Sequence, residues 1–179
     1  DDSYKQTHRQ LQQYEKILAE NGMNIAEHCV RTWFFVRDID RNYGGVVVGR
    51  RENFLLNGLT PDTHYIASTG IEGKHEDHNV LSLFDAYAVK GIPSDKRQIL
   101  YAAQNMNKTI EYGVTFERGV CIHHSAGYKQ VYISGTASID TKGAVLHVGD
   151  VKGQVKRMTE NVNALLEEAG CKWNDISQA

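Results

Sequence analysis

The chain has 179 residues, of which 41% are hydrophobic and 23% are charged, and its formal net charge is −2. This composition is typical of a globular protein with a substantial core, and it gives no electrostatic support for nucleic-acid binding, which needs clustered Lys and Arg. No apolar run approaches the roughly 20 residues of a membrane span, so we expect no membrane association. The three cysteines are far apart and show no metal or redox spacing, which favours a reduced cytoplasmic setting.

The first half of the chain predicts alternating helices and strands. A helix is indicated where apolar residues recur at helical spacing, with Gly22 as its end. Runs rich in β-branched and aromatic residues indicate three strands, and a less regular, glycine-containing segment indicates a second helix. The expected order is a helix over 4–21, a strand over 28–39, a helix over 42–57, and strands over 63–71 and 80–89.

The second half begins with a connector over 92–111, for which we expect some helical character around 94–105. A strand block follows over 112–125. The stretch from 131 to 170 then predicts a strand, a turn, a second short strand and an amphipathic helix. Asp150 stands where a helix N-cap belongs, and Gly170 supplies the C-terminal stop.

The amphipathic helix of the second half has a counterpart in the first half. Shifted by 148 positions, residues 6–22 align with 154–170 and keep matching Gln, Arg, Leu, Glu and Gly residues. We interpret this as an internal repeat whose first copy lacks its beginning and whose second copy lacks its end. We therefore expect the chain to be the central piece of a longer protein. The expected division is 1–91 for the first domain, 92–111 for the connector and 112–179 for the second domain.

Several of these residues carry a family resemblance. The segment Val131-Tyr132-Ile133-Ser134-Gly135, followed by a turn, Gly149-Asp150, Gln154, Asn161 and Ala169-Gly170, resembles the strand-to-helix signature of the YjgF/Rid family, also labelled endoribonuclease L-PSP. The strands over 30–40 and 83–89 resemble the second part of that domain. The amino-acid sequence Ser134-Gly135-Thr136-Ala137-Ser138 and the tandem layout resemble the chorismatase-like branch.

The resemblance implies an α+β domain of chorismate mutase-like form, with a mixed sheet that carries helices on one face. This chain would hold parts of two tandem copies. Such domains pack as a trimer or pseudo-trimer, so a homo-oligomer is the implied state. Ligand clefts lie between neighbouring domains, and the implied ligand is a small carboxylated metabolite.

The resemblance also implies where a substrate would bind. Family deaminases clamp the substrate carboxylate with an arginine, and a bidentate guanidinium suits that task. His64 stands at the matching position here, either as a cleft residue or as a structural histidine. Arg50 could supply the cation instead, or it could be a solvated helix residue.

Further candidates come from three strands. Asp85 matches a family carboxylate that activates water, and an inward-facing Asp would be either an acid/base group or half of a structural pair. Ser134 could orient a ligand or end a strand. Phe116 falls where the family presents a substrate-facing aromatic residue, and packing is the competing interpretation.

No metal or cofactor is expected. His75 and His78 lie in a loop, and the adjacent His123 and His124 of a strand point to opposite faces. Neither pair provides the convergent geometry that zinc requires.

Three functions remain open from the sequence. The first is hydrolysis of an enamine, imine or enol ether by a Rid-type deaminase or chorismatase-like hydrolase. The second is a non-catalytic metabolite-binding or assembly module, which the missing arginine favours. The third is a ribonuclease, which the charge balance opposes.

Overall fold

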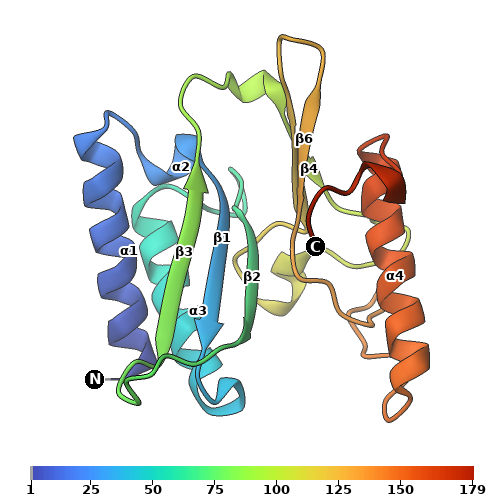
Figure 1. Ribbon diagram of the computed structural model, residues 1–179, viewed down its shortest axis with the longest axis horizontal. Helices are drawn as coiled ribbons and strands as arrows, with labels where there is room; N and C mark the ends of the chain where they lie inside the picture. The colour runs from blue at the N-terminus through green and yellow to red at the C-terminus, as the bar shows by residue number, and fades with distance from the viewer. Residues whose placement is uncertain (1) are drawn as a thin grey trace.

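The computed structural model describes residues 2–179, apart from the side chains of Ile110 and Tyr112, as two three-stranded sheets with helices packed on them (Figure 1). The α-helices are α1 (Ser3–Glu20), α2 (Ile25–His28), α3 (Ile39–Leu56) and α4 (Val151–Glu168). The strands are β1 (Cys29–Val36), β2 (Ala67–Glu72), β3 (Ser82–Ala88), β4 (Arg97–Leu100), β5 (Gly119–His123) and β6 (Lys129–Ile133). Short 3-10 turns span Ser94–Lys96, Thr109–Tyr112 and Trp173–Asp175.

The first sheet has the strand order β2-β1-β3 and is mixed, because β1 runs parallel to β2 and antiparallel to β3. Figure 1 shows α1 and α3 together against this sheet. The core between them contains Leu11 of α1, Phe34 of β1 and Phe54 of α3, all fully buried. The expected helices and strands of this half are confirmed, with boundaries shifted by a few residues.

Two glycines let α1 and α3 pack closely. A Cβ atom on Gly45 would lie 2.2 Å from Ser3 Oγ, and one on Gly49 would lie 3.1 Å from the Tyr4 carbonyl oxygen. The backbones therefore meet at a distance that only glycine permits at Gly45. This contact explains why a helix forms here despite glycines that disfavour it.

The second sheet has the order β4-β5-β6 and is antiparallel throughout. Helix α4 packs on it over a core that includes Leu100, Cys121 and Leu165. The expected helical character around 94–105 is wrong beyond the short turn, because 97–100 is strand β4, paired with β5. The expected second short strand before α4 is reduced to a single bridge between Ile139 and Val145.

Helix α4 confirms the predicted start. Asp150 accepts a hydrogen bond from the Gly153 amide at 3.0 Å and so caps the helix. The apolar stripe is covered only along the C-terminal half of the helix, where Leu165 and Leu166 are buried. In the N-terminal half Val151 is 71% exposed and Val155 is 50% exposed.

The two sheets meet along a contact that we call the seam, formed by residues 66–69 and 115–118 together with 134–135. A parallel bridge pairs Ala67 with Glu117, and the Glu117 amide donates to the Ile66 carbonyl at 3.0 Å. Val30, Ala67, Val120 and Ile122 form a small apolar core behind this bridge. The result is an α+β fold whose two halves adjoin, and this arrangement is consistent with the YjgF/Rid fold.

Candidate functional site

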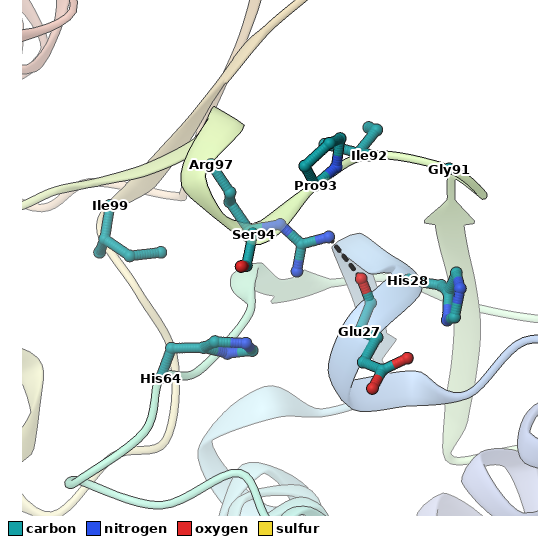
Figure 2. A pocket seen from close by; sticks show the side chains of 9 residues that line it. All are labelled: Glu27, His28, His64, Gly91, Ile92, Pro93, Ser94, Arg97 and Ile99. Carbon is teal, nitrogen blue, oxygen red and sulfur yellow. Dashed lines mark hydrogen bonds between the residues drawn. The ribbon is translucent and has the colours of Figure 1, made fainter.

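His64 lies just before β2, at the edge of a cavity of about 570 Å³. We call this the His64–Arg97 cavity. It opens where the end of α2, the segment after β3 and strand β4 come together, so both halves of the chain contribute to it (Figure 2). Its lining consists of Glu27, His28, His64, Gly91, Ile92, Pro93, Ser94, Arg97 and Ile99.

Arg97 brings a guanidinium into this cavity from the start of β4. Its Nη2 donates to the Glu27 carbonyl oxygen at 2.6 Å, which holds the side chain across the opening, as Figure 2 shows. Its Nε is buried and has no hydrogen-bond partner among the described residues. Burial lowers the pKa of Arg97, and no salt bridge within the described part of the chain joins it to an acidic side chain. The guanidinium therefore keeps unused capacity for an anion.

His64 faces the same space from the opposite wall. Its Nδ1 is buried without a partner in the described structure. Burial lowers the pKa of His64, and the positive charge of Arg97 lowers it further. The imidazole is therefore neutral near pH 7, with one nitrogen to donate and one to accept a hydrogen bond.

The other lining residues set the character of the cavity. Ile92, Pro93 and Ile99 supply apolar lining, and Glu27, which also lines the cavity, accepts a hydrogen bond from Asn24 Nδ2 at 3.1 Å through its carboxylate. A cation and a neutral imidazole together with apolar side chains suit a small organic carboxylate.

A second, smaller cavity of about 130 Å³ also adjoins His64. We call it the Glu117 chamber, after a carboxylate that is only 8% exposed. Glu117 accepts a hydrogen bond from the Tyr65 amide at 2.8 Å, and burial raises the pKa of this carboxyl despite the nearby Lys108. The chamber is lined by Thr60, Pro61, Thr63, His64, Tyr65, Tyr101, Lys108, Thr109, Glu117 and Arg118.

Asp85 does not face inward as the sequence suggested. Leu83, Asp85 and Tyr87 occupy the face of β3 opposite the core, whereas Phe84 and Ala86 pack beneath α1 and α3. Asp85 is exposed, and its carboxylate accepts a hydrogen bond from the Ala86 amide at 2.8 Å. The Asp85 carboxylate is therefore solvated and needs no buried partner. Asp85 lines neither cavity.

Arg50 and Phe116 lie together inside the seam, away from both cavities. Arg50 is 1% exposed and donates to Ser68 Oγ at 3.2 Å and to Thr115 Oγ1 at 3.3 Å. Its guanidinium carbon lies 5.8 Å from the ring centres of both Phe34 and Phe116. These contacts connect α3 to the second half of the chain.

Ser134 is also buried in the seam. Its hydroxyl accepts a hydrogen bond from the Ser68 amide at 2.9 Å and donates to the Glu117 carbonyl. Both hydrogen-bonding directions are thus used internally. Of the five candidates chosen from sequence, His64 lines both cavities described above, and the other four line neither of them.

Sequence reasoning missed Arg97 and the enclosed position of Glu117. Arg97 is 33 positions from His64 and belongs to no local motif. The period-2 alternation of Arg97 and Ile99, which both line the cavity, was the available signal.

Comparison with known proteins supports the resemblance for the C-terminal part of the chain. Residues 122–179 match the family model described as endoribonuclease L-PSP. A RutC family protein of Pyrococcus abyssi is 41% identical over 46 residues, which cover 26% of this chain and 36% of that protein. A RutC family protein of Pyrococcus horikoshii is 39% identical over the same length and shares.

These matches support the YjgF/Rid family. The chain spans about a third of the length of these curated relatives. The matched segment contains Ser134, but His64, Arg97 and Glu117 lie outside it. The matches therefore give no support to a role for any of these three residues.

The described residues contain neither a helix suited to span a membrane nor a cluster of metal-binding side chains. None of their helices is long and apolar enough to cross a membrane. None of their His, Cys, Asp and Glu side chains gathers in a group of three or more that could hold a metal ion.

Proposed function

We propose that this chain binds a small carboxylated metabolite in the His64–Arg97 cavity. The observation that carries the proposal is a pair of buried, unpartnered nitrogens, Arg97 Nε and His64 Nδ1, at one cavity. Buried polar groups normally have partners, and leaving one unpaired costs about 1–3 kcal/mol. A carboxylate bound between the two side chains would satisfy both.

The resemblance supports hydrolysis of an enamine, imine or enol ether as the reaction at this site. Family deaminases bind the carboxylate through an arginine where this chain has His64. In our proposal Arg97, from a different strand, supplies the cation that His64 lacks at neutral pH. The alternative is a binding module without turnover, which the absence of the family arginine at position 64 favours.

The tandem arrangement is also part of the proposal, with domain parts over 1–91 and 112–179 that build a trimer-like assembly. Equivalent features of α1 and α4 support it. The side chains of Asp2 and Asp150, which the shift of 148 positions relates, cap the two helices. A shared fold of the two segments would explain this agreement.

Calorimetric titration with pyruvate tests carboxylate binding, with methyl pyruvate as an uncharged control. We expect Arg97→Gln to weaken pyruvate binding at least tenfold and to leave methyl pyruvate unaffected. Arg51→Gln, which removes an exposed arginine of α3, is the matched control and should bind as wild type does. Equal pyruvate affinity for wild type and Arg97→Gln, with both proteins folded by circular dichroism, would refute the proposed site.

Turnover is tested separately from binding. Ammonia release from 2-aminoacrylate and pyruvate release from chorismate distinguish the two hydrolytic reactions. Binding of pyruvate with neither release would favour the non-catalytic module.

A further inference from the structure

We propose that Glu117 is the acid/base residue of this site, acting from the chamber that adjoins the His64–Arg97 cavity. The inference rests on the proposed function, because it assigns the proton transfers of the hydrolysis to a named group. It replaces Asp85 in that role with a residue from the other half of the chain.

The first support is position. His64 lines both the His64–Arg97 cavity and the Glu117 chamber, so the two spaces adjoin at the imidazole. Glu117 is also tied to the chain next to His64, because its carboxylate accepts a hydrogen bond from the amide of Tyr65, the following residue, at 2.8 Å. A substrate held by Arg97 and His64 would reach the carboxylate if it extended past the imidazole into the chamber.

The second support is rigidity. The Glu117 amide donates to the Ile66 carbonyl at 3.0 Å, and the Glu117 carbonyl accepts from Ser134 Oγ. With the side chain fixed at Tyr65, the residue is held at three points within the seam. Pre-positioned groups of this kind are what general acid–base catalysis requires.

The third support is the setting of the carboxylate. The ionisable groups that share the chamber are His64, Tyr65, Tyr101, Lys108 and Arg118. Lys108 favours the ionised form, yet its ammonium lies over the Tyr101 ring at 5.5 Å and forms no salt bridge with Glu117 within the described structure. Burial dominates and makes the carboxyl easier to protonate than an exposed one. A carboxyl group that is easier to protonate can accept a proton in one step and return it in a later one.

For an imine of a 2-oxo acid the proton transfers balance. Glu117 takes a proton from water as the water oxygen bonds to the imine carbon, and the imine nitrogen takes up a proton from solvent. Glu117 then returns its proton to the amine nitrogen as the carbon–nitrogen bond breaks. The hydroxyl of the intermediate loses its proton to solvent, so the products are the oxo acid and ammonia.

Glu117→Gln is the test, because the amide oxygen can still accept the Tyr65 amide while the group no longer titrates. We expect pyruvate affinity within threefold of wild type and ammonia release from 2-aminoacrylate reduced at least 100-fold. The wild-type rate should rise with pH through the Glu117 pKa, and this limb should be absent from the residual activity of the variant. Glu76→Gln, in an exposed loop, is the matched control and should retain full activity.

The outcomes separate this inference from the binding proposal. Ammonia release by Glu117→Gln above a third of the wild-type rate would overturn the assignment. So would a wild-type protein that binds pyruvate but hydrolyses neither 2-aminoacrylate nor chorismate, and that result would leave the binding function intact. Turnover that needs Glu117 without measurable pyruvate binding would support Glu117 and refute the Arg97 clamp.

Discussion

The hydroxyl of Ser134 accepts the backbone amide of Ser68 at 2.9 Å and thereby joins the two sheets across the seam. Ser68 is buried, so removing the hydroxyl takes this acceptor away from an amide that is shielded from water. We therefore expect Ser134→Ala to lower the free energy of unfolding by about 1–3 kcal/mol.

Urea denaturation measures this loss. Ser125→Ala, at an exposed position of the β5–β6 hairpin, should change stability by less than about 0.5 kcal/mol. Equal stability of the two variants would mean that the seam does not depend on Ser134.

Arg50 should behave as a buried cation without an acidic partner. Burial lowers its pKa, and its Nη2 has no hydrogen-bond partner in the described structure. Arg50→Met keeps most of the volume between Phe34 and Phe116 and removes the desolvated charge, so it should cost less than Arg50→Ala. We expect about 3 kcal/mol for the alanine variant from lost packing. Thermal unfolding that shows Arg50→Met as the less stable variant would contradict this account.

Alanine substitutions at the neighbouring glycines Gly44 and Gly45 of α3 should change stability in opposite directions. A Cβ on Gly44 meets nothing within 4 Å, whereas one on Gly45 would lie 2.2 Å from Ser3 Oγ and 2.8 Å from the Tyr4 amide nitrogen. Gly44→Ala should stabilise the protein by up to about 1 kcal/mol through helix propensity. Gly45→Ala should destabilise it by about 1–3 kcal/mol through overpacking. Differential scanning calorimetry of the pair compares them directly, and a stabilising Gly45→Ala would show that α1 and α3 separate easily.

Glu117 should make stability fall as the pH rises. Burial raises the pKa of its carboxyl in the folded state, so between the ordinary and the raised pKa the folded protein holds a proton that the unfolded chain has lost. Stability in that window therefore decreases with increasing pH. Urea unfolding from pH 4 to 8 should show this decline in wild type and a flatter profile in Glu117→Gln.

His64 should make stability rise with pH, opposite to the effect of Glu117. Its folded pKa is lowered by burial and by Arg97, so between the lowered and the ordinary pKa the unfolded chain binds the extra proton. Stability should rise with pH through that window, and His64→Gln should remove the rise. Parallel profiles for wild type and both variants would show that neither group is perturbed in solution.

The sequence predicted the elements that depend on local pattern. Helices α1 and α4, the Asp150 cap and strands β1 to β3 follow from periodicity and capping chemistry. Strand β4 was missed, because four residues with a single Arg and a single Gln become a strand only through pairing with β5.

The site was harder to predict for two physical reasons. Strand alternation assigns Asp85 to the face of Leu83 and Tyr87, but it does not tell which face the helices cover. Arg97 and Glu117 reach His64 only because the two sheets meet at the Ala67–Glu117 bridge. The contact between the two sheets depends on tertiary packing, and no local sequence pattern indicates it.

The exposed apolar residues in the N-terminal half of α4 should also affect the solubility of the protein. Val151, Val155 and Met158 form a ridge that water must cover, with Met158 39% exposed. Sulfate and phosphate increase the cost of hydrating such a ridge. Samples should consequently be least prone to precipitation in low-salt buffers without these ions. The fluorescence of an apolar dye should increase on binding to the native protein, before any heating.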